Sequence, residues 1–421
     1  MKTILTSITA GCLLAMLATA QPLRYSIVDL GTLPGGTSSS ANALNNNRLV
    51  GGNAADADGI QQNMLWWGPL RIKIGTPGLN SGIFGVNDGG LASVNAEISK
   101  KDPNNENFCG FGTGLECLAF LLQGGALIQL PTLGGNNATI GNINNKGEII
   151  GAAENSTRDP ECPTTVLADG AGPQVLDYEA VVWGPKPGAI RELKPLPGDT
   201  VGVALWINDN SQAVGASGAC ANTEPPPLAF GPHAVMWDAD GTPHDMGNLG
   251  SKVANMGLSM NNRGQVVGAS TLNDKATPGN GTHAFLWTSA AGMKDLGTLP
   301  GDTASAGLGI NDGGDVVGTS FDADGNPRAY LWHDGVMTDL NTLVAGKSPL
   351  FLLWGGAIDS HGEIVGFGAT EQGDVHAYLA TPSSGAPADS FSVAQQGSLK
   401  PVALPENVRK QFRGWRGFWG R

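Results

Sequence analysis

Short apolar runs separated by polar turns fill most of the chain, and one such unit recurs. In its clearest copy, 308–320, small and apolar residues lead to Ile310-Asn311, a glycine-rich polar turn follows, and Val316-Val317-Gly318 begins a second run. Two apolar runs joined by Asn, Asp and Gly are typical of a β-hairpin. The pattern therefore predicts a strand, a tight turn and a second strand wherever the unit recurs.

This hairpin signature has seven copies. They begin at Asn45, Asn87, Asn144, Asn208, Asn261, Asn311 and Asp359, at intervals of 42, 57, 64, 53, 50 and 48 residues. A period of this size is typical of propeller blades, because solenoid rungs are shorter. The turn glycines Gly147, Gly264, Gly313 and Gly362 are expected to supply the positive φ that a tight hairpin requires.

Each copy carries two further predicted strands. A run similar to Ala-Phe-Leu-Trp follows the hairpin, as at 284–287, and then a run similar to Met-x-Asp-Leu-Gly-Thr-Leu, as at 293–299. The last copy lacks the second run, but an equivalent lies near the N-terminus, at 27–33. An N-terminal strand that completes the last sheet closes a ring and leaves no unpaired edge. We therefore predict an all-β fold: a seven-bladed β-propeller of four-stranded blades, with the N-terminal strand completing the last blade and the strand before each turn innermost.

Composition agrees with many short strands and turns. The 421 residues include 63 glycines, 14% are charged and 41% are hydrophobic, which suits a large β core rather than a disordered chain. The formal net charge of −13 argues against a nucleic-acid partner.

The two ends of the chain differ from the repeats. Residues 1–20 resemble a signal peptide, with Lys2, an apolar stretch at 4–17 and Ala18-Thr19-Ala20 before the cleavage point. No stretch is apolar for long enough to span a bilayer. We therefore expect a secreted monomer without a transmembrane segment, located outside the cell, in the periplasm or at the cell surface.

The propeller is expected to occupy residues 21–382, and 383–421 to form a flexible linker and tail. From Lys400 onward the tail carries six basic residues against one acidic residue, with Phe and Trp between them. Such a tail is either a mobile solubilising segment or an anchor on anionic lipid, on wall polymer or on the acidic body of the protein.

Three linked motifs carry a family resemblance. They are Asp-Leu-Gly-Thr-Leu-Pro-Gly-Gly at 29–36, His-Ala-Phe-Leu-Trp at 283–287 and the hairpin signature, and together they resemble the bacterial extracellular HAF (His-Ala-Phe) repeats over roughly 25–380. Four blades depart from the His of the motif, with Asn63, Leu118, Glu179 and Arg328 in its place. The resemblance implies export and a repeat β-fold, and it implies no established activity.

Few residues indicate chemistry. His233, His283 and His376 lie on different predicted blades, so we expect hydrogen bonds between strands rather than a shared metal ion. Three Asp-x-Asp-Gly segments resemble parts of calcium loops but lack the downstream Glu, and we expect hairpin turns there. They are Asp56 to Gly59, Asp238 to Gly241 and Asp322 to Asn326, with weak calcium binding at Asp322, Asp324 and Asn326 as the alternative. No nucleotide loop, serine elbow or zinc helix is visible, so we assign no catalytic, cofactor or metal residue.

The copies differ most between their second and third strands. These connections have 25, 28 and 18 residues in blades two, three and four, at 94–118, 152–179 and 216–233, against 10 to 15 elsewhere. All four cysteines after the signal segment lie in them: Cys109, Cys117, Cys162 and Cys220. Spacing alone permits three pairings. Their placement in the loops leads us to predict Cys109–Cys117 and Cys162–Cys220.

Long loops on one sector of a propeller face are typical of a binding site, although they also arise as tolerated insertions. We therefore favour a secreted binding module for a glycan, a peptide or a surface polymer, acting through blades two to four. One alternative is an extracellular hydrolase or lyase that uses acids of the same loops, and another is a structural cell-surface protein. The acids are Glu97, Asp102, Glu106, Glu154, Asp159 and Glu161.

Overall fold

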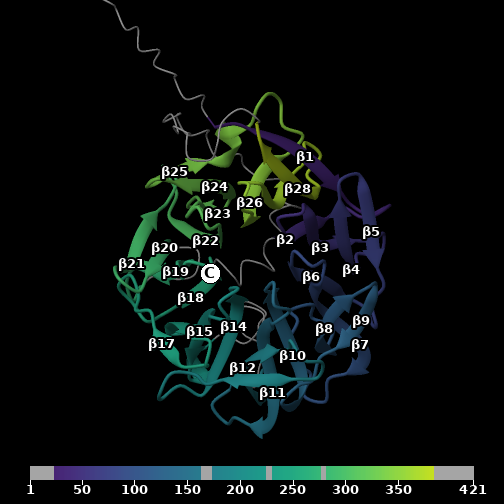
Figure 1. The fold of residues 1–421 in the computed structure, drawn as a ribbon, viewed down its shortest axis with the longest axis vertical. Helices are drawn as coiled ribbons and strands as arrows, with labels where there is room; N and C mark the ends of the chain where they lie inside the picture. Colours follow the sequence, from purple (N-terminus) through teal and green to yellow (C-terminus); the bar gives the residue numbers. More distant parts are fainter. Residues whose placement is uncertain (1–22, 163–172, 224–229, 276–280, 384–421) are drawn as a thin grey trace, which may run out of the picture.

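A computed structural model describes residues 23–162, 173–223, 230–275 and 281–383. Within them the chain forms seven four-stranded antiparallel sheets, arranged in sequence order around a central axis (Figure 1). The predicted seven-bladed β-propeller is therefore confirmed. The predicted signal peptide and the basic tail lie outside the described residues. No helix among the described residues is long and apolar enough to cross a membrane.

Blades one to four each begin with their innermost strand. Blade one contains β2 (Ser39–Leu44), β3 (Leu49–Ala55), β4 (Gln61–Trp67) and β5 (Leu70–Ile74). Blade two contains β6 (Ser81–Val86), β7 (Ala92–Lys101), β8 (Leu115–Gln123) and β9 (Ala126–Gln129). Blade three contains β10 (Gly134–Ile143), β11 (Ile149–Arg158), β12 (Leu176–Trp183) and β13 (Ile190–Leu193). Blade four contains β14 (Val201–Ile207), β15 (Ala213–Gly218), the 3-10 helix η1 (Cys220–Asn222), β16 (His233–Trp237) and β17 (Pro243–Asp245).

The last three blades complete the ring. Blade five contains β18 (Asn255–Met260), β19 (Val266–Thr271), β20 (Thr282–Thr288) and β21 (Gly292–Gly297). Blade six contains β22 (Ala304–Ile310), β23 (Val316–Phe321), β24 (Pro327–His333) and β25 (Val336–Asp339), followed by the 3-10 helix η2 (Leu340–Leu343). Blade seven contains β26 (Phe351–Ile358), β27 (Ile364–Ala369), β28 (Val375–Pro382) and, as its outermost strand, β1 (Tyr25–Gly31).

The ring closes where β1 pairs with β28, as the displaced N-terminal motif predicts. The antiparallel register runs from Tyr25 opposite Pro382 to Gly31 opposite Ala377, so the first and last described strands share one sheet (Figure 1). At the same seam an ion pair joins Arg48 of blade one to Glu363 of blade seven, at 2.7 Å. The seam is therefore held by a strand ladder and by a charge contact.

In blades one to six the asparagine that begins the hairpin turn joins its blade to the next one. Its side-chain oxygen accepts N–H groups of its own turn, as Asn45 accepts from Asn47 and Leu49. Its side-chain N–H donates to the main-chain carbonyl of the equivalent residue in the next blade, as Asn45 donates to Asn87 at 2.8 Å. The same donation is made by Asn87, Asn144, Asn208, Asn261 and Asn311, at 2.9 to 3.2 Å. The repeated turn is therefore both a hairpin and a link between blades.

Apolar packing between neighbouring sheets forms the core. One cluster combines Ile150 and Val182 of blade three with Val235 and Trp237 of blade four, all of them buried. The indole N–H of Trp237 donates to the carbonyl of Lys194 in the crossing between the two blades, at 2.7 Å. Burial of each such side chain contributes roughly 1.5–3 kcal/mol, so the Ala-Phe-Leu-Trp strand fixes its blade against the preceding one.

The glycine of the Val-Val-Gly run is required by a bulge in the innermost strand. In blade six Gly307 pairs with Gly318 and Gly309 pairs with Val317, which leaves Leu308 as the extra residue. At the bulge the carbonyl oxygen of Ala306 would lie 2.0 Å from a Cβ on Gly318. A side chain is therefore excluded. The same close approach occurs at Gly52, Gly151, Gly215, Gly268 and Gly366.

Replacing Gly318 with alanine is expected to destabilise the fold by roughly 2–3 kcal/mol, because the backbone of the bulge must move to admit a Cβ. Thermal unfolding of the full chain measures the change. Gly75→Ala is the matched control, because nothing lies within 4 Å of its Cβ position and its φ is not positive. A drop in Tm of equal size in both variants would contradict the steric explanation.

The structure moves two predicted positions by one residue: the turn glycine with positive φ in blade six, and the residue at the His position in blade one. In blade six the positive φ of the turn belongs to Gly314, at 94°, rather than to Gly313, because the third residue after the turn asparagine adopts this conformation. In blade one the strand register places Gln62, rather than Asn63, at the position of His283.

Candidate functional site

Because the strands of each blade run antiparallel, successive connections between them lie on opposite faces of the propeller. Hairpin turns between first and second and between third and fourth strands lie on one face, which we name the turn face. The second-to-third connections and the crossings between blades lie on the opposite one, the loop face. In blades two to four these connections run through 102–114, 159–175 and 219–232, leaving and re-entering their strands on the loop face, and they are longer than the 5 to 10 residues found in the other blades.

Two disulfides fix these connections. Cys109 and Cys117 are bonded within blade two, with 5.6 Å between their Cα atoms. Cys162 of the blade-three connection is bonded to Cys220 of the blade-four connection, with 4.7 Å between their Cα atoms. The second bond therefore ties two neighbouring blades together on the loop face.

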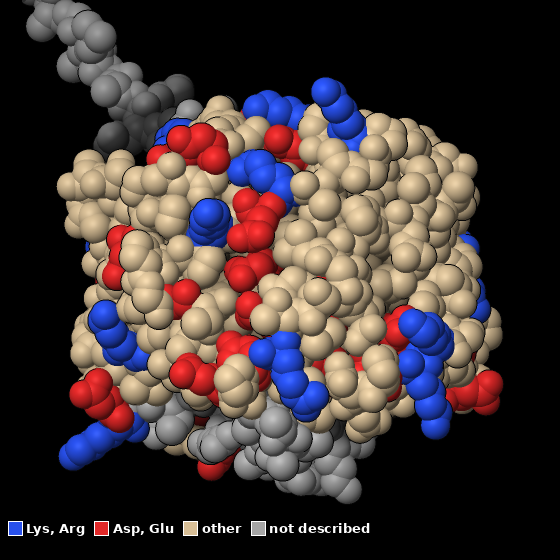
Figure 2. Space-filling model, turned by 90° about the horizontal axis from the view of Figure 1, so that it is seen from below, with Lys and Arg blue, Asp and Glu red and all other residues tan. Residues whose placement is uncertain are grey.

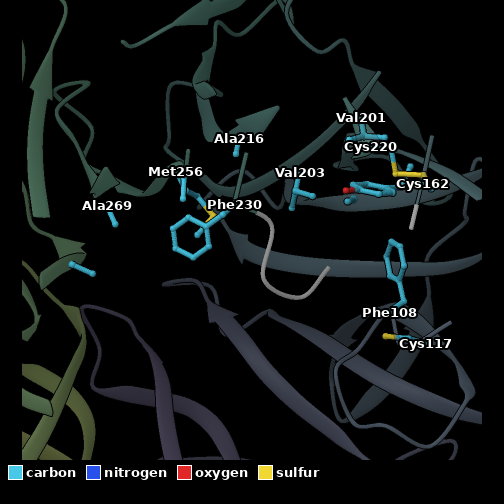
Figure 3. Packing of buried hydrophobic residues seen from close by; sticks show 14 of the residues in the cluster. Phe108, Cys117, Cys162, Val201, Val203, Ala216, Cys220, Phe230, Met256 and Ala269 are labelled. Atoms are coloured by element: carbon cyan, nitrogen blue, oxygen red, sulfur yellow. A yellow bond between two sulfur atoms is a disulfide. The ribbon is translucent and has the colours of Figure 1, made fainter. Parts of the chain in front are cut away.

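Apolar side chains beneath the connections extend the core toward the loop face. Phe108 meets Tyr178 edge to face, with 6.0 Å between the ring centroids. Figure 3 shows Phe108, the Cys162–Cys220 disulfide, Phe230 and Met256 among the side chains of this cluster. These residues belong to one buried cluster that includes residues of blades two to six. The described residues of these connections are therefore packed as part of the core.

A buried network of polar side chains lies beside this cluster. The Glu106 carboxylate accepts the backbone N–H groups of Val175 and Leu176, at 2.6 and 3.0 Å. The side-chain amide of Gln174 donates to both Glu106 and Glu154, at 3.3 and 3.0 Å. Glu106 of blade two and Glu154 of blade three therefore share a donor, and Glu106 holds the far end of the blade-three connection.

Asn137 links the other side of the network. Its amide donates to Asp102 at 2.9 Å and to Glu154 at 3.1 Å, while its oxygen accepts the Cys117 N–H at 2.9 Å. Glu97 is the blade-two counterpart of Glu154: both stand at the same place in the second strand and accept the amide of an asparagine in their own blade. The pattern therefore originates in the repeat and is extended by the loops.

The electrostatic state of the network follows from its burial. Burial first, and then the nearby Glu106 and Asp102 carboxylates, raise the pKa of Glu154 to about 9. Burial also raises the pKa of Glu106. Glu154 therefore holds its proton at neutral pH in the folded protein.

The acids of the long connections do not meet at an open mouth. Glu97, Asp102, Glu106 and Glu154 are buried and accept hydrogen bonds, whereas Asp159 is half-buried and Glu161 is exposed. General acid catalysis and nucleophilic catalysis require carboxyl groups that reach a substrate. The buried four instead hold the loop face together. Sequence spacing gave no sign of Gln174 and Asn137, the residues that join them.

The motif histidines pair with single aspartates. His283 contacts Asp295 and His376 contacts Asp29, each on the neighbouring outermost strand, at 3.0 and 2.9 Å. His233 instead contacts Asp199, in the crossing from blade three, at 2.9 Å. For two of the three histidines this is the expected hydrogen bond between strands, and the three lie in different blades.

The calcium-like segments form turns. Asp322 accepts the N–H groups of Asp324 and Asn326, at 3.0 and 2.8 Å, so one of its carboxylate oxygens closes its own loop. Asp56 and Asp240 accept backbone N–H groups of their turns in the same way. Within the described ranges, three His, Cys or acid ligand atoms approach one another only at Asp159, Cys162 and Cys220, where both sulfurs belong to a disulfide.

The turn face carries a central hollow of about 160 Å³, lined by the hairpin turns of all seven blades. A second circle of turn residues alternates Asn and Asp, and its backbone N–H groups donate from blade to blade, as Asn46 donates to Asp88 and Asn145 to Asp209, at 2.9 and 2.8 Å. Asn262 donates to Asp312 in the same way, and Ser360, which takes this position in blade seven, donates to Asn46 at 3.2 Å. The side chains around the opening of this hollow therefore form hydrogen bonds between neighbouring blades.

No protein-family model and no curated protein matches the chain. Among solved structures it is similar to the acylaminoacyl peptidase of Pyrococcus horikoshii, with 13% identity and a TM-score of 0.47 over 86% of this chain and 52% of that one. The chain thus spans about half the length of that peptidase. The β-propeller domain of the Trilobed protease from Pyrococcus furiosus gives 11% identity and a TM-score of 0.48, over 85% and 93% of the two chains. A lectin mutant of Aleuria aurantia gives 12% and 0.36, over 72% and 96%. The shared feature is the β-propeller fold.

Proposed function

We propose that this chain is a secreted propeller that binds an extracellular ligand through the loop face of blades two to four. The observation that carries the proposal is the construction of this face. Two disulfides, a buried carboxyl network and an aromatic cluster join the described parts of three neighbouring connections. A surface that is ordered before contact loses little conformational entropy on binding, which favours recognition.

Binding fits the acids of this face better than catalysis does. The Glu106 and Glu154 side chains are buried, and their oxygens accept protein N–H groups, so they stabilise the surface and do not face a substrate. The ligand is a glycan, a peptide or a surface polymer. The signal-like N-terminus and the His-Ala-Phe motif support export, and we include the chain among the HAF-repeat proteins as part of the same proposal.

Charge reversal on the loop face is expected to weaken binding to any polysaccharide or peptide that the mature chain retains on an array. Lys101→Glu and Arg158→Glu change exposed residues that border the connections of blades two and three. We expect at least a tenfold loss of affinity, about 1.4 kcal/mol, when both are changed. Lys186→Glu is the control, because this exposed residue lies in blade three on the turn face.

The outcome separates the two faces of the propeller. Binding that the loop-face changes leave within twofold, or that Lys186→Glu weakens equally, would overturn the proposal. A chain that binds no probe on the array would also overturn it.

A further inference from the structure

The repeat makes one pair of positions comparable in every blade. The first is the position in the third strand where the motif histidine stands. The second is in the outermost strand, opposite the third-strand residue that comes two positions after the first. In blade five these are His283 and Asp295, because Asp295 pairs with Phe285. In blade seven they are His376 and Asp29, by the same register. We call the two positions the charge pair, since both blades place a basic side chain against an acid, at 3.0 and 2.9 Å.

Blade six retains the charge pair with a different base. Arg328 takes the His position and contacts Asp339 at 3.3 Å. In blade four the two positions hold His233 and Asp245, but the His233 side chain contacts Asp199. Blades one and two have no acid at these positions. The two residues are Gln62 and Lys73 in blade one, and Leu118 and Gln129 in blade two. Wherever the outermost strand of these blades supplies an acid, the third strand supplies a base.

Blade three breaks this rule. Its third strand has Glu179 at the His position, and Glu192 lies at the second position because it pairs with Val181. Asp177 stands two residues before Glu179 and therefore on the same side of β12. Three carboxyl groups thus lie where the sister blades combine an acid with a base.

The central member of the three is buried, and one of its carboxyl oxygens has no hydrogen-bond partner among the described residues. Glu179 is 9% exposed, and the oxygen concerned is its Oε2. Leaving such a group unsatisfied costs free energy. Asp177 is half-buried and Glu192 is exposed, so the group opens to solvent on one side. Figure 2 looks at the side where blades three and four lie in Figure 1 and shows a row of Asp and Glu side chains with Lys and Arg side chains beside it.

The electrostatics agree with this geometry. Burial first, and then the neighbouring Asp177 and Glu192 carboxylates, raise the pKa of Glu179 to about 8. Burial also raises the pKa of Asp177, and Asp159 adds to the effect. In blades five to seven a histidine or an arginine contacts the acid, whereas in blade three Glu179 stands at that position.

We propose that Asp177, Glu179 and Glu192 bind a calcium ion, which takes the place that a histidine or an arginine has against the acid in blades five to seven. Calcium prefers carboxylate oxygens and accepts irregular geometry, whereas magnesium requires a near-octahedral shell. The ligand atoms of these three residues do not all lie within 4.8 Å of one another. Binding therefore requires Glu192, which is exposed, to rotate toward the other two carboxylates. It also requires Asp177 to coordinate through an oxygen that now accepts the Asn155 amide at 3.2 Å. Water completes the coordination on the open side. This site is independent of the binding proposed for the loop face.

Calcium titration of the full mature chain, after removal of metal with EDTA, tests the proposal. We expect one ion to bind by calorimetry with a Kd of about 10⁻⁴–10⁻³ M, the range of extracellular modules, and to raise Tm. Glu179→Gln keeps the shape of the side chain and is expected to weaken binding more than about tenfold, since it removes the central charged ligand. Glu179→Arg places the blade-six base in blade three, so it is expected to raise Tm without calcium and to abolish the calcium response.

Asp322→Asn is the matched control, because Asp322 belongs to a calcium-like turn in blade six and is expected to keep the full response. A wild-type chain whose Tm and calorimetric heat do not respond to calcium would overturn the site. So would an unchanged affinity in Glu179→Gln, or a response that only Asp322→Asn removes. Magnesium binding of equal strength would overturn the assignment to calcium.

Discussion

Replacing Arg328 with alanine is expected to lower the free energy of unfolding by about 3–5 kcal/mol, the usual cost of removing one partner from a buried ion pair. The Arg328 side chain is 1% exposed and lies between Asp302, at 2.6 Å, and Asp339, at 3.3 Å. Burial raises the pKa of both aspartates, and Arg328 opposes this rise. Alanine would leave two buried carboxyl groups without a positive charge. Equilibrium urea unfolding at pH 7 measures the loss.

Two comparisons separate charge from packing. Lys347→Ala breaks an exposed ion pair with Glu371 and is expected to cost less than about 1 kcal/mol. Arg328→Met combined with Asp302→Asn and Asp339→Asn removes every charge of the triad, and we expect most of the stability to return. A loss below about 1 kcal/mol in Arg328→Ala would show that the triad is not the source of stability assigned to it.

The ring can be predicted from the sequence because every repeat shows its strands and turns as short local patterns of residues. The missing run after Ala380 and the extra one at 27–33 are visible without coordinates, and together they require the closure that β1 and β28 make. The turn asparagines are also visible, but their link to the next blade is not. A residue such as Asn45 reaches a carbonyl 42 positions away, and only the curvature of the ring places Asn87 beside it.

The loop face was only partly predictable for the same physical reason. Its position follows from loop length and from the placement of the cysteines. Its interior depends on contacts between residues with no common spacing, such as Glu106 with Gln174, 68 residues apart. Arg328 is visible in the sequence only as a departure from His, because its two aspartates come from a crossing and from another strand. Irregular segments lack the periodicity that locates strands, so their side-chain contacts require the fold.

Glu154→Gln is expected to flatten the dependence of stability on pH. The folded-state pKa of Glu154 is about 9, above the ordinary value of 4.5, because burial and the neighbouring Glu106 carboxylate disfavour its charge. Between these values the folded protein retains a proton that the unfolded chain has lost, so the free energy of unfolding falls as pH rises. For one proton the slope is about 1.4 kcal/mol per pH unit. The stability due to protonated Glu154 is therefore complete below pH 4.5 and is lost as the pH approaches 9.

Urea unfolding between pH 5 and pH 8 provides the measurement, with the slope rather than the absolute stability as the readout. Glutamine cannot titrate, so the variant lacks this contribution even if its amide fits the donors of Asn137 less well. Because other buried acids titrate in both proteins, the difference between the two slopes isolates Glu154. Glu161→Gln removes an exposed acid of the connection that follows the Glu154 strand and is expected to leave the slope unchanged. Parallel curves for the wild type and Glu154→Gln would show that the Glu154 carboxyl group is already ionised in the folded protein.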